Sequence, residues 1–179
     1  MNTQFLSRLL LAGVMACAAL GAQAQAGGAV LKGNAVTEDN LLDALTPNAP
    51  GRTRSLKVQR DAPPPPKPSA SLLITFETGS AVLTPRARQQ LDVVSGALKR
   101  EQLAALTFNV EGHADPRGNS ATNLSLSQQR AESVCAYLTQ TGIQSNRLTA
   151  VGKGDTELIN TENTAAPENR RVTIVTNTN

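Results

Sequence analysis

Asp115 and Arg130 are the two residues whose charges and positions could form a small recognition site. Asp115 follows an alternating segment, 106–111, which predicts a strand with one buried face. Arg130 lies in a predicted helix, 125–140, and at about 100° per residue it falls on the flank of the apolar stripe. Carboxylates accept hydrogen bonds from ammonium groups, and guanidinium groups bind carboxylates through two parallel bonds. The two residues could therefore hold an amino-acid zwitterion, although the residues alone favour the alternative that they pair with each other.

The sequence offers little that could support catalysis. Its single histidine, His113, could act as a base oriented by Asp115, but no nucleophile or set of metal ligands accompanies the two residues. The simpler interpretation is that His113 ends a strand and hydrogen-bonds locally. There is no G-x-S-x-G motif and no Cys/His cluster with zinc spacing, and the G-K-G at 152–154 lacks the rest of a phosphate-binding loop. We therefore predict a protein that is not an enzyme and that uses no cofactor or metal.

The elements that must position these residues can be read from the hydrophobic pattern. Thr84 and Pro85 mark the start of a helix, as N-cap and first helical residue. Together with the helix at 125–140, this gives two helices, at 84–98 and 125–140, and four strands, at 72–76, 106–111, 148–152 and 172–175. The order β-α-β-α-β-β predicts an α+β fold, a two-layer α/β sandwich with both helices on one face of a mixed four-stranded sheet.

The first 24 residues have the pattern of a signal peptide that is cleaved after Ala24. Cys17 loosely resembles a lipidation site, but Met15 departs from that pattern, so we expect cleavage at Ala24, with lipidation of Cys17 as the alternative. Attachment to a membrane is expected only if Cys17 is lipidated. Cys135 would then be the only remaining cysteine, and its place on a helical apolar stripe predicts a buried thiol rather than an intermolecular disulfide.

Residues 25–70 are predicted to be a flexible segment that precedes a globular domain at 71–179. A short helix at 38–45 is expected, with Thr37 as N-cap, but a helix of this length is marginal alone and could dock on a partner through Leu41, Leu42 and Leu45. The proline run within 61–68 predicts an extended linker. The net charge of +3 is too small and too dispersed to favour nucleic-acid binding.

Several motifs together resemble the OmpA-like peptidoglycan-binding family, of the type found in OmpA, Pal and MotB. The G-H-A-D sequence at 112–115 is followed by N-x-x-L-S-x-x-R-A-x-x-V at 123–134. Further matches are F-E-T-G-S at 76–80, V-G-K-G at 151–154 and N-R-R-V at 169–172. The resemblance covers roughly residues 71–176, nearly the whole predicted globular domain, and it implies the fold described above.

The resemblance also implies a ligand, the diaminopimelate of peptidoglycan stem peptides. Asp115 would take its ammonium group and Arg130 its carboxylate, while Asn123 would shape the loop between them. Thr78, Gly79 and Ser80 would line the site through backbone N–H groups. Gly79 and Leu158 depart from the family pattern, where a polar residue and a proline are common, and the segment 155–169 is individual to this chain.

The sequence therefore predicts a non-catalytic peptidoglycan-binding protein of the Gram-negative periplasm, associated with the outer membrane. An alternative is an adaptor in which residues 25–60 dock on an envelope protein complex while the wall-binding domain serves only to localise it.

Overall fold

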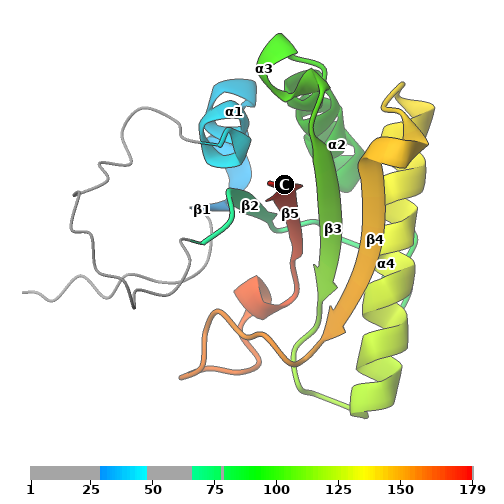
Figure 1. Ribbon diagram of the computed structural model, residues 1–179. Helices are drawn as coiled ribbons and strands as arrows, with labels where there is room; N and C mark the ends of the chain where they lie inside the picture. Colours follow the sequence, from blue (N-terminus) through cyan, green and yellow to red (C-terminus); the bar gives the residue numbers. More distant parts are fainter. Residues whose placement is uncertain (1–28, 48–65, 78, 179) are drawn as a thin grey trace, which may run out of the picture.

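One mixed sheet of five strands forms the centre of the molecule (Figure 1). The computed structural model describes residues 29–47, 66–77 and 79–178. The strands are β1 (Ala29–Leu31), β2 (Ser69–Leu72), β3 (Thr107–His113), β4 (Leu148–Gly154) and β5 (Val172–Asn177). They lie in the order β1-β2-β5-β3-β4, with β1/β2 and β3/β4 parallel and with β5 antiparallel to both β2 and β3.

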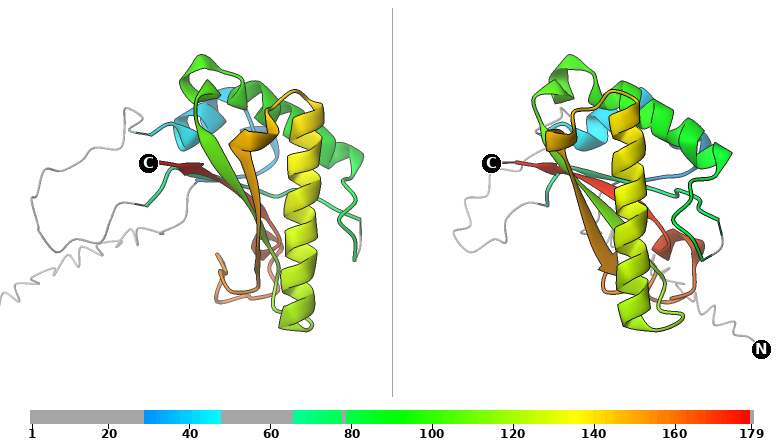
Figure 2. Two further views of the ribbon diagram at one scale, coloured as in Figure 1. Left: turned by 45° about the vertical axis from the view of Figure 1, so that its right-hand side comes forward. Right: turned by 90° about the vertical axis from the view of Figure 1, so that its right-hand side faces the viewer.

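The helices form a second layer on one face of this sheet. They are α1 (Glu38–Leu45), α2 (Pro85–Leu98), α3 (Glu101–Ala104) and α4 (Ser120–Gln140), with short 3-10 turns at Gly33–Ala35, Ser145–Arg147 and Pro167–Asn169. Helix α4 runs along β3 and β4, and α2 packs beside it and against α1 (Figure 2). A single hydrophobic core joins the two layers. The predicted two-layer α+β sandwich is therefore confirmed, but the predicted number of four strands is wrong.

The fifth strand comes from the segment that was predicted to be flexible. Strand β1 pairs with β2 in parallel, from Ala29 opposite Ala70 to Leu31 opposite Leu72. The predicted helix at 38–45 is present as α1, and Thr37 caps it by accepting a hydrogen bond from the backbone N–H of Asn40.

Helix α1 is an integral part of the core and does not stand apart from the domain. The side chains of Leu41 and Leu45 are both 0% exposed. The carbonyl of Leu45 also accepts a hydrogen bond of 2.7 Å from the hydroxyl of Thr176, on β5. The expectation of a flexible segment at 25–70 is therefore wrong for residues 29–47, because these leucines bury their surface within the same chain.

Two further boundaries differ from the prediction. Helix α4 begins at Ser120 rather than 125. Asn119 caps it, because its side-chain oxygen accepts hydrogen bonds from the backbone N–H groups of Ala121 and Thr122. The first strand of the predicted domain ends at Leu72, and the chain beyond it makes only an isolated bridge, between Phe76 and Leu83. Polar residues carry no hydrophobic period, so the first turn of α4 was assigned to the preceding loop.

Some predicted features lie outside the described residues. These are the signal peptide at 1–24, with Cys17, and most of the linker at 61–68. Cys135 is half-buried against the core, and burial raises the pKa of its thiol to about 11, which agrees with an unreactive structural thiol. In the part of the chain that the structure describes, no helix has the length and apolarity needed to cross a membrane.

Candidate functional site

Close backbone contact between α4 and the sheet fixes the position of Arg130 relative to Asp115. A Cβ atom on Gly112 would collide with the carbonyl of Ser127, and one on Gly152 would lie 2.8 Å from the backbone nitrogen of Gln128. Both collisions involve helix backbone, which cannot move aside as a flexible side chain can. The glycines therefore let α4 lie directly against β3 and β4, and the backbone N–H of Gly154 donates a 2.9 Å hydrogen bond to the Ser127 hydroxyl.

Asp115 lies just beyond the end of β3 and is 5% exposed. Two arginines hold its carboxylate. Arg117 donates from Nε to Oδ1 at 3.1 Å and from Nη2 to Oδ2 at 2.8 Å, and Arg170 donates from Nη1 to Oδ2 at 2.8 Å. The bonds from Arg117, followed by the one from Arg170, keep the pKa of this carboxyl well below its usual range, so that it is ionised at neutral pH.

Arg130 does not pair with Asp115, so the ion pair that the residues alone favoured is not what forms. Its Nε donates a 3.1 Å hydrogen bond to the carbonyl of Ser80, and its guanidinium lies 4.9 Å from the centre of the Phe76 ring. Burial lowers the pKa of Arg130, and the nearby positive charge of Arg170 lowers it further. A negatively charged ligand bound to Arg130 would stabilise its positive charge, which burial and Arg170 both disfavour.

At the turn that includes Gly79 and Ser80, the structure differs from the expectation that backbone N–H groups line the site. Thr78 lies outside the described residues. Gly79 has a φ of +65°, in the region that favours glycine, and is exposed. The N–H of Ser80 donates to the carbonyl of Glu77, so this N–H is engaged within the turn and not directed at a ligand. Ser80 instead contributes its carbonyl, which orients Arg130.

Asn123 lies in the first turn of α4 and not in a loop. Its Nδ2 donates to the backbone carbonyl of Asp115 at 3.1 Å and to Oδ2 of Asp155 at 3.2 Å. Ser120 donates to the other oxygen of Asp155 at 2.9 Å. The side chain of Asn123 thus ties the start of α4 to the loop that carries Asp115 and to the chain that leaves β4.

The segment 155–169, to which the sequence assigned no role, is folded around the fully buried side chain of Asn169. Its amide accepts from the N–H groups of Ile159 and Asn160 and donates to the carbonyls of Asn160, Asn163 and Thr164. The neighbouring Arg170 also donates to the carbonyl of Ala165, at 3.1 Å. The segment therefore positions Arg170 for its contact with Asp115.

Sequence reasoning missed two residues of this site, Arg117 and Arg170. Arg170 belongs to the N-R-R-V motif at 169–172, which was noted without a role. Arg117 is two residues from Asp115, a spacing that does not by itself indicate a contact.

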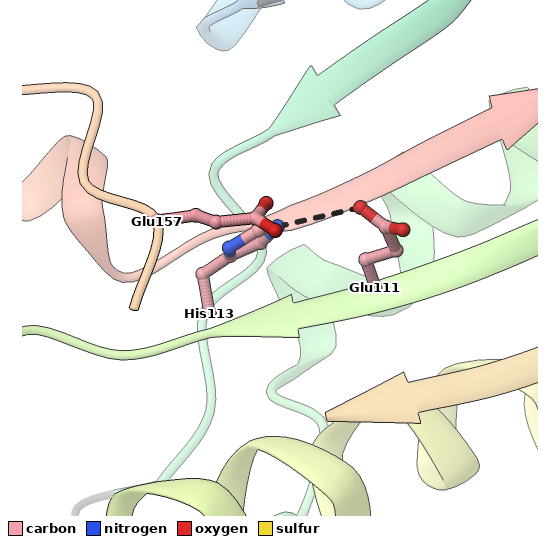
Figure 3. Close-up of side chains that lie close together, drawn as sticks. All are labelled: Glu111, His113 and Glu157. Carbon is pink, nitrogen blue, oxygen red and sulfur yellow. Dashed lines mark ion pairs between the residues drawn. The ribbon is translucent and has the colours of Figure 1, made fainter. Parts of the chain in front are cut away.

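A second group of titratable residues lies near the end of β3 (Figure 3). Glu111, His113 and Glu157 have side-chain atoms within 4.8 Å of one another, which is close enough for a metal site. Lys153, however, already brings a positive charge there, with its Nζ 2.8 Å from Glu157 and 3.5 Å from Glu111. We interpret this group as an ion-pair cluster in which Lys153 neutralises the carboxylates.

His113 is 2% exposed, and neither ring nitrogen has a hydrogen-bond partner among the described residues, contrary to the expected local bond. Its Nε2 lies 3.9 Å from Oε2 of Glu111, which is beyond hydrogen-bonding distance. Burial, and to a smaller extent the charges of Arg171 and Lys153, lower its pKa to about 3. The imidazole is therefore neutral at physiological pH and is not hydrogen-bonded to Asp115. A general base needs a pKa near the working pH, so this geometry does not favour a His113–Asp115 dyad.

Comparison with known proteins identifies the family. The model of the OmpA family matches residues 75–171. Outer membrane protein A of Bordetella avium is 39% identical over 101 residues, 55% of this chain and 51% of that protein. The peptidoglycan-associated lipoprotein of Brucella melitensis is 31% identical over 106 residues, 58% of this chain and 62% of that protein.

Among solved structures, a putative MotB-like protein from Desulfovibrio vulgaris superimposes with a TM-score of 0.53 at 27% identity, over 60% of this chain and 71% of that one. This chain thus spans only part of the length of the relatives it matches. Their names agree with the predicted localisation at the cell envelope. Because the family model covers more than half of its 179 residues, the chain belongs to the OmpA family.

Proposed function

We propose that this protein binds peptidoglycan without catalysis, by holding the free amino-acid end of diaminopimelate between Asp115 and Arg130. The observation that carries the proposal is the arrangement of these two charges. Asp115 is an ionised carboxylate at the end of β3. Arg130 lies on helix α4, and its half-buried guanidinium is hydrogen-bonded to the carbonyl of Ser80. The ammonium group of the ligand would bind Asp115 and its carboxylate would bind Arg130. The name of the Brucella relative, a peptidoglycan-associated lipoprotein, supports this choice of polymer.

In the structure Asp115 is already neutralised, so a ligand ammonium must replace one of its two arginines. The side chain of Arg117 is 65% exposed, whereas Arg170 is 39% exposed and is also held by the carbonyl of Ala165. Exposed ion pairs are typically worth only about 0.2–1 kcal/mol. We infer that the ammonium group displaces Arg117 and that Arg170 stays in place.

The proposal includes no chemical step. The one histidine is neutral and buried, and the matched proteins are named as outer-membrane proteins and lipoproteins. One site for a small zwitterion should bind weakly. Peptidoglycan repeats the same stem peptide many times, so rebinding along the polymer would strengthen retention.

In the adaptor alternative, Leu41, Leu42 and Leu45 would have to be free to bind an envelope partner. Leu41 and Leu45 are buried in the core of their own domain, and Leu42 packs against it, so these leucines are not available for an envelope partner. We propose a folded unit made of residues 29–47 together with 66–178, preceded by a signal peptide at 1–24. Deleting 25–60 would remove β1 and α1, and would therefore disrupt the wall-binding domain as well.

A pull-down with purified sacculi tests the proposal. Asp115→Asn removes one charge from the site at nearly constant volume, and Arg130→Gln replaces the other charge with a shorter, neutral polar side chain. Asp43→Asn and Arg88→Gln remove the same charges from exposed positions on α1 and α2. We expect the wild type and both controls to sediment with the sacculi, and both site variants to stay in the supernatant while retaining wild-type circular dichroism. Sedimentation of folded Asp115→Asn and Arg130→Gln at the wild-type level would contradict the proposed site.

A further inference from the structure

A cavity of about 480 Å³ lies beside Arg130, and its wall is strongly cationic. Five basic side chains line it: Lys32, Arg86, Arg130, Arg170 and Arg171. None of the described residues that line the cavity is acidic. Because like charges gathered around one space repel one another, such a wall favours an anionic occupant.

Three of the five cations are already engaged by the protein. Arg130 binds the carbonyl of Ser80, Arg170 binds Asp115, and Arg171 donates to the carbonyl of Glu157 at 3.0 Å.

Lys32 and Arg86 differ from the other three. Both side chains are exposed, and neither side chain makes a hydrogen bond or ion pair with another described residue. Arg86 stands in the first turn of the 14-residue α2, where the helix dipole disfavours a positive charge and where no acidic residue compensates it. Lys32 follows β1, outside the residues that match the family.

Three residues that line the cavity also carry buried polar atoms without a hydrogen-bond partner in the described part of the chain. They are Oε1 of Gln90, both ring nitrogens of His113 and Nε of Arg171. Buried polar atoms are nearly always satisfied, by protein, water or ligand. Because these atoms are closed off from solvent, they do not themselves face the open cavity, and the case for an anionic occupant rests on the charges of its wall.

We propose that this cavity is a second anion subsite, which takes a further carboxylate of the same stem peptide, and that Lys32 and Arg86 select for it. The inference rests on the proposed function, since the diaminopimelate end must lie at Asp115 and Arg130. In such peptides the neighbouring glutamate is linked through its side chain, which leaves its α-carboxylate free. Where the second carboxyl of diaminopimelate is amide-bonded to the next residue, that carboxylate is the acidic group nearest to the bound zwitterion. Lys32 and Arg86 would therefore distinguish peptides in which this group is charged from peptides in which it is amidated.

Isothermal titration of the purified protein with two synthetic peptides tests the inference. The first is L-Ala-γ-D-Glu-meso-diaminopimelate with the carboxyl of its peptide-linked centre amidated, so that its only free carboxylates are that of the zwitterionic end and the glutamate α-carboxylate. The second is identical except that the glutamate α-carboxylate is also amidated. We expect Lys32→Gln and Arg86→Gln each to weaken binding of the acidic peptide by about two- to fivefold, as for exposed charge pairs, and to leave binding of the amidated peptide unchanged. Arg88→Gln, which removes an exposed charge from the same helix, should change neither affinity.

The outcomes separate the subsite from the proposed function. If the wild type binds both peptides equally and the Lys32 and Arg86 variants bind like the wild type, the second subsite is refuted while the zwitterion site stands. If the wild type binds neither peptide, the proposed function fails and the subsite fails with it. Arg130→Gln should lose both peptides, because it removes the contact that they share.

Discussion

Removing the side chain of Arg117 should strengthen ligand binding. The structure shows Arg117 as the principal neutralising partner of Asp115. If the ligand ammonium has to displace it, the substitution Arg117→Gln removes a competitor. Arg170 remains on Oδ2 of Asp115, and the backbone N–H of residue 117 remains on Oδ1, so the carboxylate should stay ionised at neutral pH.

The size of the effect follows from the exposure of the pair. The two side-chain bonds, at 3.1 and 2.8 Å, form a bidentate contact, but the Arg117 side chain is 65% exposed and solvent screens it. Such a pair contributes about 0.2–1 kcal/mol. With bidentate geometry we take the upper part of that range, which corresponds to a dissociation constant lowered about two- to fivefold.

Isothermal titration with meso-diaminopimelate, at neutral pH and fixed ionic strength, measures this change. Arg100→Gln is the matched control, because Arg100 donates from Nε and Nη2 to Glu38 at 3.0 and 2.6 Å and its side chain is 52% exposed. Arg100 does not line the cavity, and the control should leave the affinity unchanged. A loss of affinity in Arg117→Gln would refute the reasoning, because it would make Arg117 a ligand contact and not a competitor.

Two further predictions concern stability. Leu45→Ala should lower the free energy of unfolding by about 2–5 kcal/mol, because it empties a fully buried position, whereas Asp43→Ala on the exposed side of α1 should change it by less than about 0.5 kcal/mol. Equal urea midpoints for these two variants would show that α1 is not part of the folded unit. The folded pKa of His113, about 3, lies below its ordinary value of 6.5, so the unfolded state binds the proton first and stability is lost as the pH falls from 6.5 towards 3. Between pH 7 and pH 4 the wild type should therefore lose about 3 kcal/mol more than His113→Gln in urea unfolding, and parallel losses would contradict a buried neutral imidazole.

The regular parts of the domain were predictable because their signals are local. Thr84 and Pro85 gave the start of α2, since capping depends on the next three residues and on nothing distant. The alternation at 106–111 gave β3, because one face of that strand meets the core and the other does not. The motif at 112–115 indicated where the strand ends.

The N-terminal elements illustrate what a local pattern leaves open. Leu41 and Leu45 lie on one side of a short helix, and this pattern is the same whether the helix packs on its own domain or on a partner. Strand β1 is three residues long, too short to show an alternation. Both elements are stabilised by contacts with β2 and α2, so only the folded structure could assign them to the domain.

The sequence by itself determined the family, the layered fold and the choice of Asp115 and Arg130. The motifs and periodicities behind these conclusions each involve residues that are close together in the chain, so they can be recognised without the folded structure. The tertiary structure decided which charges meet. Asp115 pairs with Arg170, 55 residues away, and Lys32 comes from the far edge of the sheet to line the same cavity as Arg130. Electrostatic interactions depend on distances in space, and the hydrophobic pattern that fixes the elements does not contain those distances.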